Sequence, residues 1–473
     1  MDQLEFKELL DKKIKYGVIP PYVYTYPPRS AYRENIKGIS IDDVWREDLE
    51  SSVSKELNLY LHIPFCRYKC GFCNLYTVTS QSTDLYEAYV DALCLQLIQS
   101  KEIIQKRNLK TVYFGGGTPS LLSKKQISKI LSVLSDVYPN WRNSTLEVCI
   151  EATPDSIAEN PEIVSYLVNL GFTRINMGMQ SLQSKELKDA GRIKSNPEVI
   201  RTALKICKES NLANLSTDLI IGFAEQTKES WKDSVNELLT YRPETISTYF
   251  LTIRPDAWFS KTGLYSYSRT PELYERYDYA RKKIIEAGYV QESNVRFKIQ
   301  GRGGYVQKTL QFDGAPYLGL GVGARSYTNS YDYMVGNNGH NSKEEIGSYM
   351  KSINTNSLTI DSLFKNTDEE RIRKRICLDL FDLDLRELEE FNWDKHSDEF
   401  IPLLDILVKD QLLFRVGETR FQLTPEGYKY RDIISTLMFS EKIVELDRDF
   451  YQQIEDKNDR LKLIETKEVE WAS

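Results

Sequence analysis

Three cysteines lie close together in the segment LHIPFCRYKCGFCNLY, where Cys66, Cys70 and Cys73 have the spacing C-x3-C-x2-C. Thiolates are soft ligands that suit iron–sulfur clusters, and three on one short loop can converge on a cuboidal cluster. Because three ligands leave one of four irons open, that iron can chelate the amino and carboxylate groups of S-adenosylmethionine (SAM). The spacing therefore favours a [4Fe–4S] cluster whose electron splits SAM and yields a 5′-deoxyadenosyl radical.

A zinc site and a set of structural thiols are the alternatives to a cluster. Zinc takes a fourth ligand, usually from a second pair of cysteines or histidines. His340 and His396 are distant and unpaired, and His62 lies in an apolar strand pattern that is more typical of a core or supporting histidine. The cluster is therefore favoured. The other four cysteines stand in apolar patterns and are expected to be small buried side chains: Cys94, Cys149, Cys207 and Cys377.

Six short β-like runs alternate with helical patterns, such as 85–104 and 125–138, beyond the start of the cysteine segment. Such β/α units require parallel strands with right-handed crossovers, in either an open doubly wound sheet or a complete or partial barrel. Periodicity does not separate these arrangements, but both place ligands at the carboxyl ends of the strands. The strand candidates are 57–64, 111–116, 146–152, 174–181, 214–222 and 245–252.

Glycines and polar side chains end several of these strands. Residues 115–119 read GGGTP, and glycines let a backbone approach a ligand closely, although a tight turn is the commoner reason for such a run. Glu151 ends the next strand and can accept two ribose hydroxyls. Gln180, Arg192 and Asp218 follow at or after later strands, where a salt bridge or a helix cap is the competing explanation. Their order after the cysteine loop favours a nucleotide site.

The two ends of the chain differ from the β/α region. Residues 1–55 are rich in Tyr, Pro and charge and predict an irregular N-terminal arm before a core at 56–365. Residues 366–473 predict helices, a short hairpin around Gly417 and a further helix from Thr424, in the manner of a winged helix. Because the formal net charge is −7, a packing or substrate-covering role is favoured over DNA binding.

Composition bounds the location and the partners of the protein. No apolar run approaches the length of a bilayer span, and the N-terminal segment is charged throughout, unlike a signal peptide. Seven cysteines in 473 residues are too few for a disulfide scaffold. These observations predict a cytoplasmic protein that acts on a small-molecule substrate, with no nucleic-acid or membrane partner. A flavodoxin- or ferredoxin-type electron donor is expected from the reaction class, and no catalytic acid or base can be assigned.

The cysteine segment resembles a known family signature. Tyr60, His62, Pro64, Phe65, the three cysteines and Phe72 match the pattern Y-x-H-x-P-F-C-x3-C-x-F-C. This is the pattern of the radical SAM group that includes oxygen-independent coproporphyrinogen III oxidase, haem-chaperone-like proteins and class C radical SAM methyltransferases. The resemblance extends over roughly residues 55–440 and implies an α/β fold, a partial (β/α)6 radical SAM barrel with a C-terminal winged-helix-like domain.

The resemblance also implies two SAM molecules side by side. By the family's motifs, the SAM on the cluster would contact Tyr60, Gly116 and Glu151. Two further positions, Thr252 and Arg325, would lie near SAM, the latter in a segment similar to the family's L-G-x-G-x-x-A-x-S. The second SAM would be lined by Phe72, Gly117, Thr118, Gln180, Arg192 and Asp218.

Several departures from the oxidase pattern shape the functional expectation. GRIKS has Lys194 where family oxidases and chaperones usually carry a histidine, and GFAEQT replaces the usual G-L-P-G-Q-T. NLYT follows the cysteines in place of the continuation common in haem-related members. These features favour transfer of a methyl or methylene carbon from the second SAM to an sp2 carbon, giving C-methylation or cyclopropanation. The alternatives are oxidative decarboxylation of a porphyrinogen propionate and a haem-binding chaperone.

Overall fold

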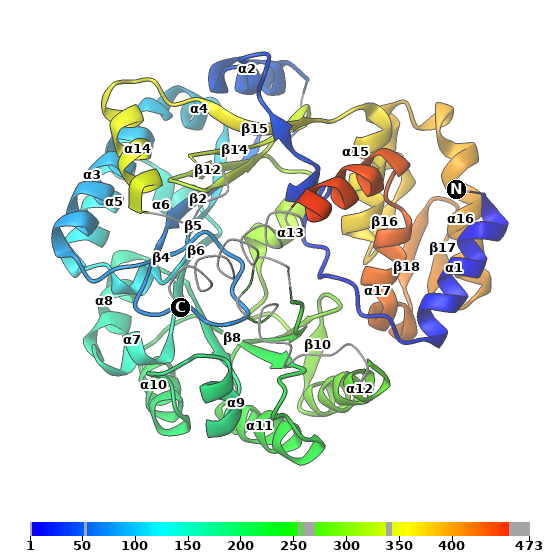
Figure 1. The fold of residues 1–473 in the computed structure, drawn as a ribbon, viewed down its shortest axis with the longest axis horizontal. Helices are drawn as coiled ribbons and strands as arrows, with labels where there is room; N and C mark the ends of the chain where they lie inside the picture. Colours follow the sequence, from blue (N-terminus) through cyan, green and yellow to red (C-terminus); the bar gives the residue numbers. More distant parts are fainter. Residues whose placement is uncertain are drawn as a thin grey trace, which may run out of the picture.

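The computed structural model describes residues 2–51, 54–253, 257, 259, 270–336 and 343–453. A 13-stranded sheet forms its centre (Figure 1). Seven neighbouring strands run parallel, and their order, β12-β2-β5-β6-β7-β8-β9, follows the chain except that β12 returns beside β2. Their bounds are β2 (Glu56–Ile63), β5 (Asn108–Gly116), β6 (Glu147–Ala152), β7 (Arg174–Gln180), β8 (Asn214–Ile221), β9 (Thr245–Phe250) and β12 (Tyr317–Leu320).

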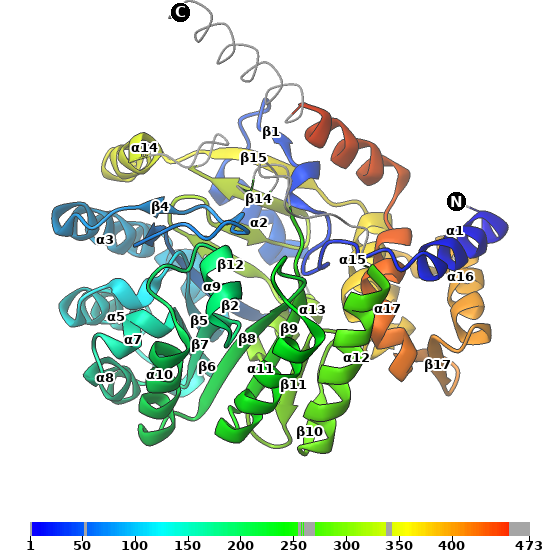
Figure 2. The same cartoon turned by 60° about the horizontal axis from the view of Figure 1, so that its bottom comes forward.

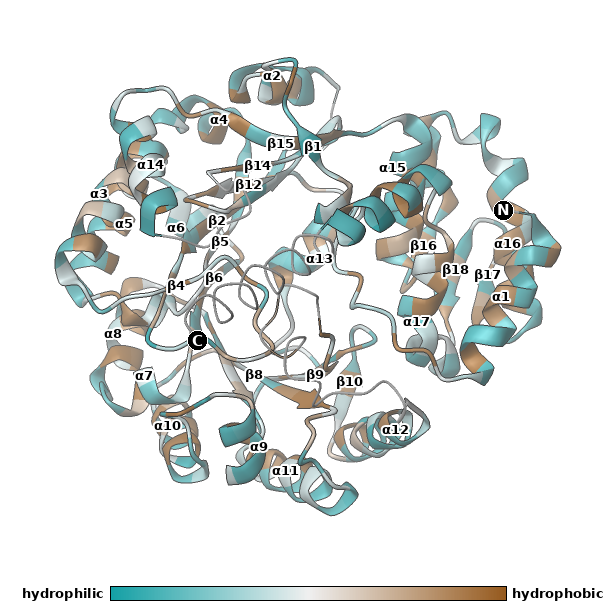
Figure 3. Ribbon diagram, viewed as in Figure 1, coloured by the Kyte–Doolittle hydropathy of each residue, from teal (hydrophilic) through white to brown (hydrophobic). Residues whose placement is uncertain are grey.

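The helices that connect these strands lie on the outside of the sheet (Figure 2). Their starts follow capping chemistry: Ser123 and Thr227 each accept a backbone N–H in a capping box. In Figure 3 the outward faces of helices such as α10 and α11 carry polar colouring. The helices of the barrel are α3 (Thr83–Gln99), α4 (Lys101–Gln105), α5 (Lys124–Val137), α6 (Trp141–Ser144), α7 (Pro154–Ala158), α8 (Glu162–Leu170), α9 (Ser184–Asp189), α10 (Pro197–Glu209), α11 (Lys228–Tyr241) and α12 (Thr270–Glu286).

Side chains alternate strictly between the two faces of the parallel strands. In β2, Leu57, Leu59 and Leu61 are fully buried in the apolar layer under the helices, whereas Tyr60 and His62 belong to the inner face. The inner positions of the neighbouring strands are also polar or small. The barrel therefore encloses polar groups at its centre and places its main hydrophobic core between the sheet and the helices.

Antiparallel strands extend the sheet on both sides, and its first and last strands do not pair, so the barrel is partial. The glycine-rich segment at 317–327 forms a hairpin of two strands. Such short strands, interrupted by glycines, lack the length that makes a period of two visible. The added strands are β11 (Arg296–Ile299), β10 (Tyr289–Gln291), β13 (Arg325–Tyr327), β14 (Tyr331–Val335), β15 (Ile360–Lys365) and β1 (Arg33–Glu34).

The C-terminal part has a hydrophobic core of its own beside the barrel. Of the helices expected here, α15 ends at Asp379, and a 3₁₀ helix covers Leu385–Phe391. A three-stranded sheet has the order β16-β18-β17, with Gly417 (φ 71°) in the turn between its last two strands. The elements are α15 (Asp368–Asp379), β16 (Leu383–Asp384), α16 (Ser397–Lys409), β17 (Leu413–Val416), β18 (Arg420–Leu423) and α17 (Pro425–Leu437).

The N-terminal segment is more regular than its composition predicts. Helix α1 (Gln3–Lys15) is capped by Asp2 and buries Phe6 and Leu10 in the C-terminal core, against α16 and α17. Helix α2 (Ile41–Ser51) precedes β2. Between them, an extended stretch runs between the C-terminal part and the barrel (Figure 1). The expectation of an irregular arm is thus wrong for both helices, and the domain limits at 55 and 365 stay predictions.

No helix among the described residues has both the length and the apolar character that crossing a membrane requires.

Candidate cluster and nucleotide site

The cysteine loop lies at the carboxyl ends of the parallel strands. It follows β2, and the short strand β3 (Phe65–Cys66) pairs with β4 (Val78–Thr79) across it. The amide of Gly71 donates to the carbonyl of Ala190 at 3.0 Å, which ties the loop to the segment after α9. The three predicted ligands, Cys66, Cys70 and Cys73, are partly exposed and line one pocket together.

The surroundings of the thiols suit a cluster better than a single ion. Among the described residues, no three histidine, cysteine or carboxylate groups converge on a single metal position. In an iron–sulfur cube each thiolate binds a different iron, so its ligands stand farther apart than those of one ion. The Arg192 guanidinium donates to the Cys70 sulfur at 3.7 Å, which places a positive charge beside the three thiols. Burial raises the pKa of the Cys66 thiol to about 12, which a bound metal would reverse.

The glycines that close β5 hold the backbone against the cysteine loop. Gly116 has φ 115°, and a Cβ there would lie 2.6 Å from the His62 ring. A Cβ at Gly117 would lie 2.5 Å from the carbonyl oxygen of Phe65. The Thr118 amide donates to that carbonyl at 2.8 Å, and the Thr118 hydroxyl is 3.5 Å from the Cys66 sulfur. Only glycine fits both positions, so this strand end and the cysteines form one rigid wall of the pocket.

Glu151 stands on the neighbouring wall. One of its carboxylate oxygens accepts from the Tyr113 hydroxyl and the other from the Gly116 amide, each at 2.9 Å. Burial raises the pKa of this carboxyl to about 7, and these two hydrogen bonds oppose the rise. Each oxygen keeps further acceptor capacity, which a pair of ribose hydroxyls could use.

A second polar group faces the pocket from β7 and β8. The Asn176 amide donates to one oxygen of Asp218 at 2.9 Å, while the other oxygen is buried without a hydrogen-bond partner among the described residues. Burial raises the pKa of the Asp218 carboxyl. Gln180 adopts a left-handed backbone (φ 74°) where β7 ends in a bulge. Strain and an unsatisfied oxygen in one place are typical of a ligand site.

Eight of the eleven predicted cofactor-binding residues line this pocket with the cysteines, and three do not. Tyr60 belongs to the inner face of β2, where its hydroxyl is 3.1 Å from His62 Nδ1. Thr252 follows β9 outside the pocket lining, and Arg325 binds an N-terminal tyrosine. The eight are Phe72, Gly116, Gly117, Thr118, Glu151, Gln180, Arg192 and Asp218.

His62 is not placed to bind iron. Its Nε2 is 2.9 Å from the Tyr76 carbonyl, so this nitrogen donates and Nδ1 accepts from Tyr60. Burial lowers the pKa of His62 to about 4. The neutral ring therefore positions two segments next to the pocket. His340 lies outside the described residues.

Sequence reasoning missed several polar residues of the lining, among them Asn176 and Asp155. Asn176 follows the alternation of inner positions in RINMGMQ, which was the available signal. Asp155 is buried and accepts from the Tyr68 hydroxyl at 2.9 Å and from the Ser195 hydroxyl at 3.2 Å. It joins the cysteine loop to the loop after α9, a long-range contact that no local pattern indicates.

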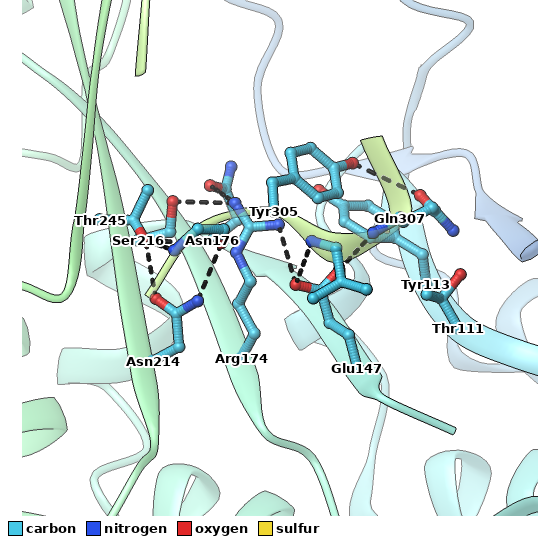
Figure 4. A network of polar contacts seen from close by, with 12 residues as sticks. Thr111, Tyr113, Glu147, Arg174, Asn176, Asn214, Ser216, Thr245, Tyr305 and Gln307 are labelled. Carbon is cyan, nitrogen blue, oxygen red and sulfur yellow. Dashed lines mark hydrogen bonds and ion pairs between the residues drawn. The ribbon is translucent and has the colours of Figure 1, made fainter. Parts of the chain in front are cut away.

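A hydrogen-bonded network closes the opposite end of the barrel (Figure 4). The Glu147 carboxylate accepts from the amides of Val306 and Gln307, at 3.2 and 3.3 Å, and lies 3.9 Å from Arg174. The Arg174 guanidinium lies 3.9 Å from the centre of the Tyr305 ring. These groups come from the amino ends of the strands and from the segment before α13 (Val306–Phe312). We call them the barrel floor.

Comparison with known proteins identifies the architecture. The Radical SAM superfamily profile matches residues 60–238, the part that holds the cysteines and the pocket walls. The chain belongs to the radical SAM superfamily. Membership implies a [4Fe–4S] cluster and SAM, and the three thiols, the glycine wall and the unsatisfied Asp218 oxygen fit them.

Relatives place the chain in a narrower group of this superfamily. It is 24% identical to the oxygen-independent coproporphyrinogen III oxidase of Salmonella typhimurium over 435 residues, which cover 87% of this chain and 91% of that protein. It is 31% identical to the heme chaperone HemW of Buchnera aphidicola over 275 residues, covering 57% and 69%. The solved coproporphyrinogen III oxidase of Escherichia coli shares the fold, with a TM-score of 0.71 at 21% identity, covering 88% and 96%.

Proposed function

We propose that this radical SAM enzyme removes CO2 from a propionate side chain of a porphyrinogen, using two SAM molecules in the pocket. The observation that carries the proposal is the extent of the similarity. The match to the oxygen-independent oxidase covers 87% of this chain, whereas the HemW match cited above and a second HemW match at 33% identity each cover 57%. The methylation or cyclopropanation favoured by the sequence departures has no support from these relatives, so decarboxylation takes its place.

The histidines give a haem carrier little support. Both ring nitrogens of His62 are engaged with Tyr60 and Tyr76, so neither can bind haem iron. His396 lies in the C-terminal part, before α16. Lys194, where related proteins usually have histidine, lies 3.7 Å from Glu159 in a half-exposed ion pair.

When bound, the cluster and SAM would supply a carbon-centred radical that removes a hydrogen atom from the substrate. The chain's own groups would bind and orient. Three cysteines would hold the cluster beside Arg192, and Gly116, Gly117 and Thr118 would let the methionyl part of SAM approach the wall. Glu151 would accept the ribose hydroxyls. Enclosing the radical and aiming it is the protein's main task in such a reaction.

A second SAM is supported by polar groups that the first does not use. Asp218, Asn176 and Gln180 face the same pocket from β7 and β8, beyond the cysteine, glycine and Glu151 walls. The free oxygen of Asp218 offers an acceptor for hydroxyl or ammonium groups.

The products test this proposal directly. Oxygen-free protein with SAM, dithionite, coproporphyrinogen III and an external one-electron acceptor should release CO2 and 5′-deoxyadenosine. Loss of CO2 from a propionate that has given up a hydrogen atom leaves a vinyl group and passes one electron to the acceptor. Formation of S-adenosylhomocysteine without CO2 would contradict decarboxylation and favour carbon transfer. A Soret band on adding haem, with no SAM cleavage, would favour a carrier.

A further inference from the structure

Two partly buried basic side chains inside the barrel, Lys308 and Arg325, have no carboxylate within ion-pair distance among the described residues. Arg325 donates to the Tyr24 hydroxyl at 2.7 Å, and Lys308 donates to the Gln311 side chain at 2.7 Å. The Arg325 guanidinium and the Lys308 ammonium each lie 5.4 Å from the centre of the Tyr24 ring. We call Lys308 and Arg325 the cation pair.

Most other buried cations among the described residues are ion-paired, and buried Arg192 instead donates to the Cys70 sulfur and the Gly178 carbonyl. Arg107 binds Asp48, and Lys374 binds both oxygens of Asp332 at 2.8 and 2.9 Å. An uncompensated charge in a low-dielectric interior is costly, and such charges are usually paired or bound to a ligand. The charges of Lys308 and Arg325, which have no carboxylate partner among the described residues, therefore indicate a binding site for an anion.

Aromatic rings connect the cation pair to the nucleotide pocket. Five tyrosines stand in a row inside the barrel, four on strands of the sheet and the fifth, Tyr305, just before α13, with neighbouring ring centroids 5.2 to 5.8 Å apart. The row starts next to Arg325 on β13, and the hydroxyl of one member, Tyr113, binds Glu151 in the pocket wall. Lys308 and Arg325 keep part of their surface accessible. The row consists of Tyr327, Tyr317, Tyr60, Tyr113 and Tyr305.

We propose that Lys308 and Arg325 bind a carboxylate of the substrate, whose flat body lies against the tyrosine row. The substrate class named here rests on the proposed function, but the geometry of the cation pair does not. A carboxylate would accept charge-assisted hydrogen bonds from both groups and offset the burial of their charge. The carboxylate would compete with the Tyr24 hydroxyl for Arg325, so Tyr24 would move away from Arg325 when the substrate binds.

Contacts with α17 and β9 hold the N-terminal segment so that Tyr24 lies beside Lys308 and Arg325. Val23 is bound on both sides by α17, because its amide donates to Asp432 at 3.2 Å and its carbonyl accepts from Arg431. Tyr22 packs edge-on against Tyr249 of β9, with centroids 5.5 Å apart. The C-terminal part thereby positions one wall of the substrate site.

The protonation state of Lys308 provides a second way to detect binding at the cation pair. Burial, together with the positive charges of Arg296, Arg325 and Arg431, lowers the pKa of Lys308 to about 7. The other groups at the Lys308 ammonium are the rings of Tyr24 and Phe312 and the Gln311 amide. A bound carboxylate would raise this pKa, so binding at pH 8 should take up a proton and affinity should fall as pH rises above 7.

Binding of an oxygen-stable probe tests the inference. We would reconstitute the cluster in the full chain, add SAM, and titrate coproporphyrin III and its tetramethyl ester. Lys308→Met and Arg325→Gln should each weaken binding of the acid about tenfold or more, because each removes a charge-assisted hydrogen bond. Neither should weaken binding of the ester by more than twofold. Lys298→Met is the matched control, since Lys298 lies 2.8 Å from Glu292.

Stability and proton uptake separate a binding role from a structural one. Lys308→Met should raise the melting temperature at pH 6, because it removes an unpaired buried charge, while it weakens the acid probe. Calorimetry in two buffers of different ionisation enthalpy should show proton uptake at pH 8 with the native chain and none with Lys308→Met.

The inference is overturned if the acid binds both variants as tightly as the native chain, if acid and ester lose affinity equally, or if neither probe binds. Its failure differs from failure of the proposed function. If binding of the acid depends on Lys308 but no CO2 is released, the carboxylate site is supported and the proposed decarboxylation is not. If CO2 is released and Lys308→Met does not change the release, the decarboxylation is supported and the carboxylate site is not.

Discussion

At the barrel floor, Arg174 lies beside Glu147 and over the Tyr305 ring, whereas at the rim one buried oxygen of Asp218 has no hydrogen-bond partner in the part of the chain that the structure describes. Both regions place charge inside the same sheet, on the inner positions of neighbouring strands. The floor supplies an opposite charge, and its groups close the barrel. The rim leaves groups unsatisfied where three thiols line the pocket. Two nitrogens of Arg174 also lack a hydrogen-bond partner among the described residues, so what separates the two ends is the nearby opposite charge at the floor and not complete hydrogen bonding.

Removing one of the three pocket thiols should have the largest effect on activity, because it removes a ligand of the cluster at the binding end of the barrel. Cys70→Ala should abolish the charge-transfer absorption of the cluster and all formation of 5′-deoxyadenosine. Cys207→Ala is the matched control, since Cys207 is buried in α10 and lines no part of the pocket. A Cys70→Ala protein with unchanged absorption would show that the ligand assignment is wrong.

Replacing Arg174 in the barrel floor should lower the free energy of unfolding and should not remove the cofactor. Arg174→Met leaves the Glu147 carboxylate buried without its cation, and loss of one partner of such a pair typically costs about 3–5 kcal/mol. Urea unfolding at pH 7.5 would measure the change. Arg201→Met is the control, because Arg201 forms partly exposed ion pairs that contribute about 1 kcal/mol or less.

The floor prediction has a defined pH dependence. Burial already raises the pKa of Glu147, and losing Arg174 should raise it further. A carboxyl whose folded pKa is raised destabilises the fold above its unfolded value of about 4.3 and not below it. The deficit of Arg174→Met should therefore shrink as the pH falls toward 4. A deficit that stays constant would mean that lost packing, and not an unpaired charge, is the cause.

Neutralising the unsatisfied rim group should give a smaller effect of opposite sign. Asp218→Asn should raise the free energy of unfolding of the SAM-free protein by about 1 kcal/mol at pH 7.5, because burial disfavours the carboxylate. The gain should vanish below about pH 3.9, where the unfolded carboxyl is also protonated. Equilibrium dialysis should show weaker SAM binding. A variant that loses stability while keeping SAM affinity would assign Asp218 to structure.

The sequence predicted six of the seven parallel strands to within a few residues, because each has a long β-like run between clear helical patterns, and it missed the short strand β12. The cysteine loop and eight pocket residues were found because each stands at or just after a strand end, where order along the chain reflects neighbourhood in space. Asp155 and the cation pair were not found as such, because their roles depend on contacts between distant segments. Arg325 was expected at SAM, but its partner is Tyr24 of the arm.

The central claim is that three cysteines hold a cluster with one iron left for SAM. Mössbauer spectra of oxygen-free, iron-57-reconstituted protein measure this most directly. The account predicts a [4Fe–4S] cluster with one distinct iron site whose signal changes when SAM is added. The account would be contradicted by a cluster with four equivalent thiolate-bound irons whose signal does not change when SAM is added. Protein that holds zinc or no metal would also contradict it.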